Sequence, residues 1–328
     1  MKTTIFALIS VLGLTISCSS PLDRVYSKLD LAIERQEYYD LKFTQVKDSL
    51  TAMLKSDNPD SLRWETALKL STMMLYHNLD SCYQYIRAMD SLCRNDQRQR
   101  SISKVSHLQF LQKTDSIGRA LSVMEQITPS ELDTETFSLY CNAVYHIYMD
   151  MSKNTPEYVE KAKELLDDWW QKDSTNARCI HYSNIYTPRS DIISRLQKSP
   201  MKTLNDTAKV NDMLAREYMR QSDLEKAIMH YAIAAECDMR LSAKNYNALF
   251  ALAKLLFREG DIDRANRYVY TTRKDALASN YKIRYENVFT HEMEIMNMML
   301  QQQKQKKHAY PQIAARSFVF CLLLPFYM

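Results

Sequence analysis

The side chains that commonly do chemistry are spread along this chain without the spacings that catalysis or metal binding needs. The seven histidines lie far apart, and none is followed four residues later by another. His291-Glu292 resembles the start of a zinc-protease helix but lacks the second histidine one turn on. Asp261 and Asp263 lack the glycine and the distal glutamate of a calcium loop. We therefore expect no metal site and no cofactor.

The paired carboxylates are equally poor candidates for catalysis. Asp167 and Asp168 are adjacent, so on a helix they point about 100° apart and cannot face each other across a sugar cleft. Trp169 and Trp170 follow them, and we expect these rings to pack in the core or between repeats, with ligand stacking as the alternative. The chain has only three glycines in 328 residues, too few for the glycine-rich loops that bind phosphate groups. The chain is expected not to be an enzyme.

The charge pattern argues against nucleic acid as a partner. Lys and Arg number 43 and Asp and Glu number 39, and the two signs are interspersed. No basic stretch carries the interleaved aromatic residues that stack on bases.

The N-terminus has the order of a secretory signal peptide, with Lys2 before an apolar stretch and Cys18 after it. Residues 14–18 resemble a bacterial lipobox, although Thr15 stands where leucine is favoured. We expect residues 1–17 to be removed and Cys18 to carry lipid. The protein would then be anchored in the cell envelope and face the periplasm. Ordinary secretion and an uncleaved anchor are the alternatives.

The C-terminus ends in an apolar run of 12 residues, 317–328, which is shorter than the ~20 residues of a spanning helix. We interpret residues 308–328 as an incomplete membrane segment, which would make a second contact with the membrane. The alternative is a strand or coil that covers the last helix.

Five cysteines remain besides Cys18 and Cys321, and all lie in stretches of helical apolar periodicity. No Cys-x-x-Cys occurs. Buried free thiols are expected, with one long-range disulfide as the alternative.

Residues 22–300 read as a series of amphipathic helices, because apolar residues recur at spacings of three and four and no segment alternates like a strand. Prolines and capping residues separate the helices. The fold class is therefore predicted to be all-α.

A repeat lies within this helical region. Ala227 and Ala265 are 38 residues apart and stand in matching contexts, with Leu214-Ala215 before the first and Leu252-Ala253 before the second. Small residues at these offsets let two helices approach closely, as in tetratricopeptide (TPR) repeats. Ala265 should therefore be a packing position.

The repeat pattern recurs more weakly at Ser81, Ala120 and Ala162, and in a degenerate unit between residues 175 and 197. With these units the sequence predicts an α-solenoid of about six or seven helical pairs. The predicted order is entry helices at 18–60, repeats at 61–275 and a long exit helix at 276–307.

The segments around Leu29-Asp30, Leu79-Asp80, Gly260-Asp261 and Asp275-Ala276 resemble a family of bacterial envelope proteins with TPR-like repeats. This resemblance implies a role as the extracytoplasmic part of a membrane-linked regulator. Members commonly continue through a membrane helix into a cytoplasmic segment, whereas this chain stops inside the apolar stretch. We therefore expect the extracytoplasmic part of a truncated regulator.

Repeat stacks bind partners on the concave surface made by their first helices. In the two best repeats the predicted groove positions combine cations with aromatic rings, which suits a peptide segment, including an acidic one. They are Lys209, Asp212, Arg216, Met219, Asn247, Phe250, Lys254 and Phe257. We expect a scaffold or sensor that binds a protein or peptide partner. The alternative is a glycan-binding uptake lipoprotein of the outer membrane.

Overall fold

The computed structural model describes residues 20–93, 96–244 and 247–278, together with positions 289, 292–293, 296–298, 300–301 and 304. The predicted signal peptide, the lipid site Cys18 and the apolar tail at 308–328 lie outside the described residues, as does most of the predicted exit helix. The described part is helical and contains no strand. The all-α prediction is confirmed.

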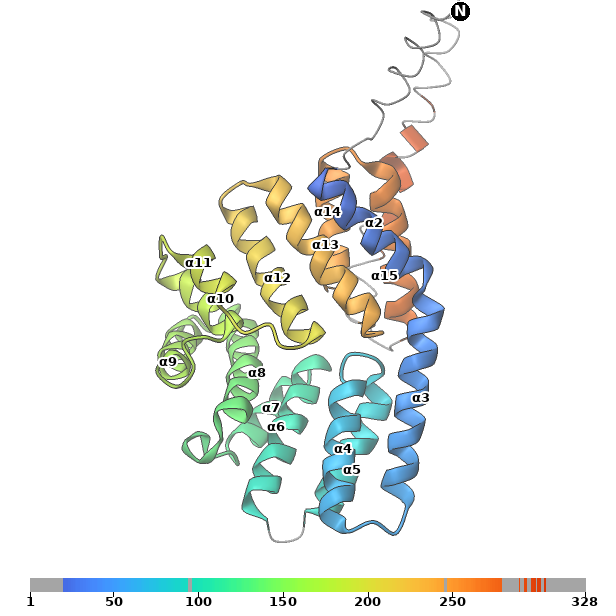
Figure 1. The fold of residues 1–328 in the computed structure, drawn as a ribbon. Helices are drawn as coiled ribbons and strands as arrows, with labels where there is room; N and C mark the ends of the chain where they lie inside the picture. Colours follow the sequence, from blue (N-terminus) through green and yellow to red (C-terminus); the bar gives the residue numbers. More distant parts are fainter. Residues whose placement is uncertain are drawn as a thin grey trace, which may run out of the picture.

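Six helical pairs follow one another along the described chain, in agreement with the predicted number (Figure 1). The degenerate unit predicted between residues 175 and 197 is the fourth of them. The short 3₁₀ helix η1 (Pro129–Glu131) precedes the third pair. The pairs are α4 (Asp60–Met74) with α5 (Leu79–Leu92), α6 (Gln97–Lys113) with α7 (Ile117–Met124), α8 (Thr134–Ser152) with α9 (Glu157–Lys172), α10 (Ala177–Tyr186) with α11 (Ile192–Gln197), α12 (Leu204–Arg220) with α13 (Leu224–Arg240), and α14 (Asn247–Arg258) with α15 (Ile262–Ala278).

The small residues of the repeat pattern lie where the helices touch. Ala215, Ala227, Ala253 and Ala265 are each fully buried. A methyl group at these positions lets the backbones of paired helices come close, which a larger side chain would prevent. The predicted repeat register is therefore confirmed.

The turn inside each of the last two pairs needs one residue with a left-handed backbone. Gly260 has φ 86° between α14 and α15, and Ser222 has φ 60° between α12 and α13. Glycine takes this conformation freely, whereas serine does so at a cost. The chain thus makes such turns with few glycines by placing serine or aspartate there, as at Ser242 and Asp115.

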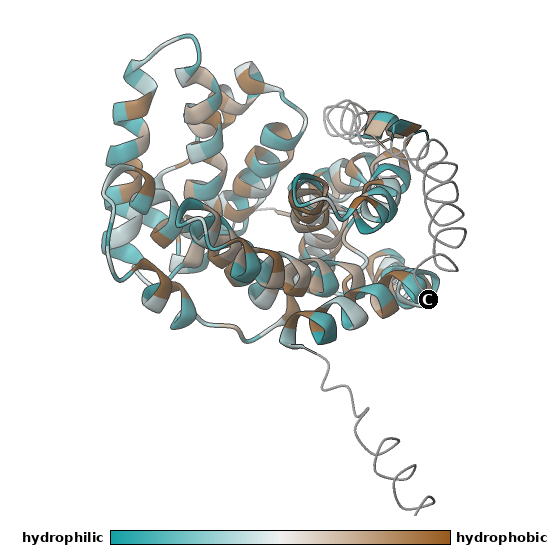
Figure 2. Cartoon of the chain, turned by 90° about the horizontal axis from the view of Figure 1, so that it is seen from above, coloured by the Kyte–Doolittle hydropathy of each residue, from teal (hydrophilic) through white to brown (hydrophobic). Residues whose placement is uncertain are grey.

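The helices carry both hydrophobic and hydrophilic residues along their length, as Figure 2 shows. Trp169 is fully buried and donates a hydrogen bond from Nε1 to Ser138 Oγ over 3.0 Å, so its predicted core role is confirmed. The predicted free thiols are also confirmed, since all five described cysteines are unpaired and buried: Cys82, Cys93, Cys141, Cys179 and Cys237. Within the described ranges no helix is both long and apolar enough to cross a bilayer.

The first two helices do not simply extend the stack. Helix α2 (Pro21–Glu34) packs against α13, far along the chain, while α3 (Gln36–Lys55) contacts both α13 and α4. Figure 1 shows α2 lying across the α13–α15 region and α3 running from there to α4. Tyr26, Leu29 and Ala32 of α2 belong to the same buried cluster as the last two helical pairs. The described chain is therefore closed into a ring.

Polar contacts reinforce this closure at two points. At the first, Asp30 accepts hydrogen bonds from Arg267 over 2.5 Å and from the Tyr268 hydroxyl over 2.8 Å. At the second, the buried Lys244 ammonium lies 2.7 Å from Asp40 and 3.2 Å from Asp275. Buried charges of this kind are tolerated only when they are paired, so the second contact fixes how α3 meets the last repeats.

Further polar contacts surround Lys244. Gln36 donates to Asp275 over 2.7 Å, and Ser242 donates to Asp40. Burial raises the pKa of Asp275, whereas Lys244 opposes this shift.

Candidate functional site

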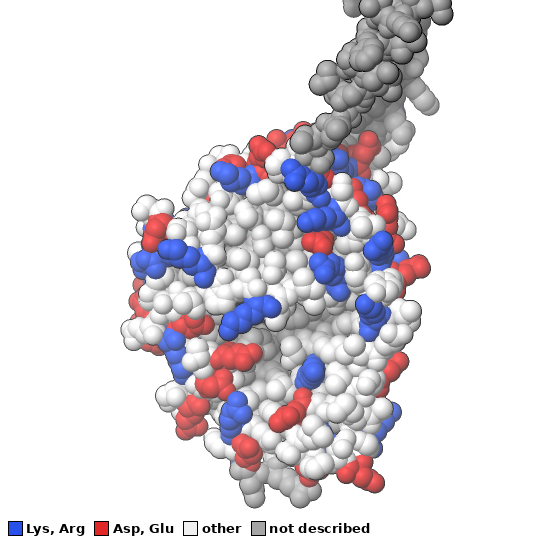
Figure 3. All heavy atoms as spheres, in the orientation of Figure 1, with Lys and Arg blue, Asp and Glu red and all other residues white. Residues whose placement is uncertain are grey.

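The ring surrounds a cavity of about 520 Å³. The face of the molecule seen in Figure 3 is hollowed between the helices of the first pairs and those of the last ones. The first helix of every one of the six pairs contributes residues to the lining, as does α3. The cavity is therefore the concave face of the repeat stack, bounded on its remaining side by α3.

The lining follows a repeated rule in three consecutive first helices. Each contributes two residues one turn apart, which places both side chains on the same helix face. The successive helices are 36 and 34 residues apart in sequence at these positions. The pairs are Asn142 and His146 on α8, Arg178 and Tyr182 on α10, and Asp212 and Arg216 on α12.

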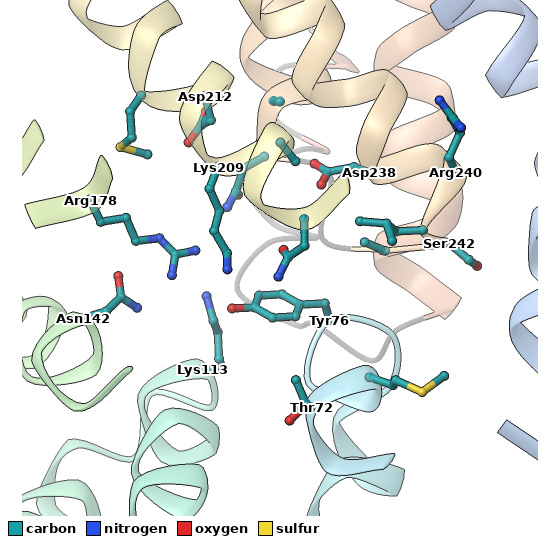
Figure 4. Close-up of a pocket in the computed structure, with 18 of the residues that line it drawn as sticks. Thr72, Tyr76, Lys113, Asn142, Arg178, Lys209, Asp212, Asp238, Arg240 and Ser242 are labelled. Atoms are coloured by element: carbon teal, nitrogen blue, oxygen red, sulfur yellow. The ribbon is translucent and has the colours of Figure 1, made fainter. Parts of the chain in front are cut away.

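Cationic side chains predominate in the cavity wall over the carboxylates Asp212 and Asp238. The six cations are Lys42, Lys113, Arg178, Lys209, Arg216 and Arg240. Figure 4 shows Arg178, Lys209 and Lys113 converging from three helices toward the Tyr76 hydroxyl, whereas Arg240 lies apart from them.

Local structure sets where these three cations stand. The Asn176 side chain caps α10 and accepts a hydrogen bond from the Arg178 backbone N–H over 3.1 Å. Thr203 and Asp206 form a capping box at the start of α12, one turn before Lys209. Lys113 is the last residue of α6, where a positive charge suits the helix dipole.

Helices α10 and α12 are held together by a buried polar contact. His181 Nδ1 lies 2.7 Å from Glu217 Oε1, and Asn184 donates to Glu217 Oε2 over 3.1 Å. Both Glu217 and His181 are almost completely buried. This contact fixes the spacing between Arg178 and Lys209, which project from the same two helices.

Burial and neighbouring groups shift the pKa values of Lys209 and Arg178 in opposite directions. Burial, and after it the nearby Arg178 guanidinium, lower the pKa of Lys209 to about 8, although Asp206 opposes this shift. Burial alone would lower the pKa of Arg178 as well, but Tyr76, Tyr182 and Asp212 raise it above its ordinary value. Arg178 is therefore a permanent charge, and Lys209 titrates within reach of physiological pH.

His146 adds a polar but uncharged group. Burial, with help from the Lys113 and Arg178 charges, lowers the pKa of His146 from 6.5 to about 4. Its Nε2 lies 3.2 Å from the Tyr182 hydroxyl, which also donates to Asn142 Oδ1 over 3.4 Å. At neutral pH this wall of the cavity presents an aromatic ring and hydrogen-bonding groups without charge.

The structure places some of the predicted groove residues in the cavity and others outside it. Four of the eight line the cavity, namely Lys209, Asp212, Arg216 and Asn247. The other four lie beyond it on α12 and α14: Met219, Phe250 and Phe257 pack against the core, and the Lys254 ammonium stands 4.7 Å from the centre of the Phe250 ring. Binding by these residues stays a prediction.

Sequence reasoning missed Arg178, Lys113, Tyr76 and Asn142, all of which line the cavity. The repeat pattern is weak in this part of the sequence, so it does not mark these residues as equivalents of the cavity-facing positions of α12. The spacing of 34 to 36 residues between equivalent pairs is the signal that could have found Asn142 and Arg178.

Asp212 is the main counter-charge and is already engaged. Arg216 Nε donates to its Oδ2 over 3.1 Å, while its buried Oδ1 has no hydrogen-bond partner within the described ranges. No group of three or more potential metal ligands occurs among the described residues. The arrangement is thus built to bind through charge, hydrogen bonds and aromatic rings.

Residues 33–290 match the family model described as the SusR N-terminal TPR domain. The chain belongs to this family. The matched range contains every cavity-lining residue and all six helical pairs. Most of α2, including Asp30, precedes it. TPR-type domains are in general non-enzymatic scaffolds for protein interactions. No curated protein matches this chain.

The two histidines with strongly lowered pKa values, His146 and His77, should make the fold sensitive to acid. Burial lowers the pKa of each to about 4, so between pH 6.5 and pH 4 the unfolded chain binds protons that the folded chain does not. The free energy of unfolding should therefore fall by about 1–2 kcal/mol per histidine between pH 7 and pH 5. Urea denaturation at the two pH values measures this fall. It should be smaller in His146→Gln, and an equal fall in both proteins would contradict the assignment.

Proposed function

We propose that this SusR-type TPR domain is a binding module of the cell envelope whose ring cavity takes up a short segment of a partner protein. The observation that carries the proposal is the convergence of all six first helices and α3 on one partly enclosed cavity. Its volume falls within the range of about 300–1,000 Å³ that small ligands occupy. A few residues of an extended segment fit this space, whereas a folded domain does not.

The cavity wall suits an extended peptide. Side-chain amides and hydroxyls can pair with peptide N–H and C=O groups, and Phe43 and Tyr39 offer rings to apolar side chains. His77 stacks on Phe43 with ring centres 4.2 Å apart, which holds the Phe43 ring in place. A rigid wall lowers the entropy cost of binding.

A glycan is the second candidate, because the same rings and amides are typical of sugar-binding sites. Asn142, Asn205 and Asn247 offer both donors and acceptors to hydroxyl groups.

Photo-cross-linking from inside the cavity tests the proposal. Phe43 is replaced by p-benzoylphenylalanine in the full-length chain, and the same replacement at Tyr270, which is 55% exposed on α15, is the matched control. We expect an adduct from position 43 that mass spectrometry identifies as a peptide segment. A sugar adduct would support the glycan candidate instead, and an adduct yield no higher than that of the control would contradict both.

Two single variants place the binding in the cavity. Arg216→Gln removes a cavity charge, so the adduct from position 43 should fall at least several-fold. Lys254→Gln changes a charge outside the cavity and should leave the adduct unchanged. Glutamine replaces Arg216 because a glutamate at this position would be repelled by Asp212. In the wild type the Asp212 carboxylate lies 3.1 Å from Arg216 Nε.

The proposal includes anchoring through lipid on Cys18, which the leader and the lipobox-like residues 14–18 support. Palmitate labelling in cells should mark the wild-type chain in the envelope fraction and should miss Cys18→Ala. Equal labelling of the two would contradict the anchor without bearing on the cavity.

A further inference from the structure

We propose that Arg178, Lys209 and Lys113 form a subsite for one anionic group, a carboxylate or a phosphate, of the segment that the cavity takes up. This inference rests on the proposed function and names the chemistry that the ligand must carry.

The three cations come from separate helices, α10, α12 and α6, yet their charged ends converge (Figure 4). The Tyr76 hydroxyl lies beside them and helps to raise the pKa of Arg178, and the Lys113 ammonium stands 5.7 Å from the centre of the Tyr76 ring. A guanidinium, two ammonium groups and a hydroxyl around one space are the donors that hold carboxylates and phosphates.

Two of these cations, Arg178 and Lys209, are not closely paired with acids of the described ranges. No carboxylate of the described ranges lies within 4.0 Å of the Arg178 guanidinium, and the closest carboxylate oxygen to Lys209 is that of Asp206, at 4.0 Å. Asp212 binds Arg216, and Asp206 also caps α12 through Thr203. Holding like charges together in a partly enclosed space is unfavourable unless a ligand supplies the opposite charge.

The protonation of Lys209 agrees with this account. Four charged groups lie near the Lys209 ammonium. The cations are Arg178 on α10 and Lys113 on α6, and the acids are Glu135 on α8 and Asp206 on α12 itself. Burial, followed by the Arg178 charge, outweighs the two acids and lowers the pKa of Lys209 to about 8. A bound anion would stabilise the charged form, so binding should weaken as the pH rises above 8.

A positional peptide library tests the subsite on the immobilised full-length protein. Capped and amidated hexapeptides carry glutamate, phosphoserine, glutamine or lysine at one fixed position and mixed residues elsewhere, and retained peptides are measured by mass spectrometry. We expect the glutamate or phosphoserine pools to be retained at least tenfold better than the glutamine pool, as befits charged hydrogen bonds. The relative retention of the two anionic pools distinguishes carboxylate from phosphate.

Variants assign the preference to the named residues. Arg178→Gln with Lys209→Gln should abolish it, whereas Lys254→Gln, which changes a charge outside the cavity, should keep it. Lys209→Arg should retain the preference at pH 9, where the wild type loses part of it, because arginine stays charged. This rescue separates the loss of a charge from a loss of folding.

Two negative results of this experiment would have different meanings. Retention of peptides without any preference for the anionic pools would overturn the subsite and leave the proposed function standing. No retention of any pool above an empty matrix would overturn the peptide-binding function and, with it, the subsite.

Discussion

The packing of α2 against α13 is the contact on which the cavity depends. Leu29, fully buried, and Tyr26 enter the cluster formed by the last two helical pairs, and burying such side chains contributes about 1.5–3 kcal/mol each. Since α3 follows directly, this contact also places Tyr39 and Phe43 opposite the first helices of the later repeats. An open solenoid of the same repeats would expose these residues on one wall of a groove. Closure converts the groove into a partly enclosed site.

Enclosure explains the electrostatics of the site. The same lysine on a flat surface would keep its ordinary pKa, but inside the ring Lys209 has its pKa lowered to about 8. His146 stays neutral for the same reason. The ring thus turns side chains that are unremarkable in sequence into a permanent guanidinium, a titratable amine and a neutral imidazole facing one space. Binding by charge and hydrogen bonds is stronger in such a space than on an open helix face.

The sequence predicts what depends on local spacing. Alanines such as Ala227 and Ala265 specify close helix packing over a few turns, so the repeat register and the number of pairs follow from their offsets. Ring closure depends instead on contacts such as Asp30 with Tyr268, which are 238 residues apart and leave no periodic signal. Half of the predicted groove lies in the cavity because first-helix positions do face inward. Phe250 and Phe257 do not line it, because the cavity lies at the other end of α14, near Asn247.

Hydrogen–deuterium exchange of α2 in the wild-type protein tests ring closure most directly. An isolated helix of 14 residues is marginal in water, so the amides of Pro21–Glu34 can be protected only by packing on α13 and α15. The account predicts that α2 exchanges as slowly as α13, as part of one cooperative unit. Exchange of α2 at the rate of an unfolded peptide, with α13 still protected, would show that the ring is open and would contradict the partly enclosed cavity.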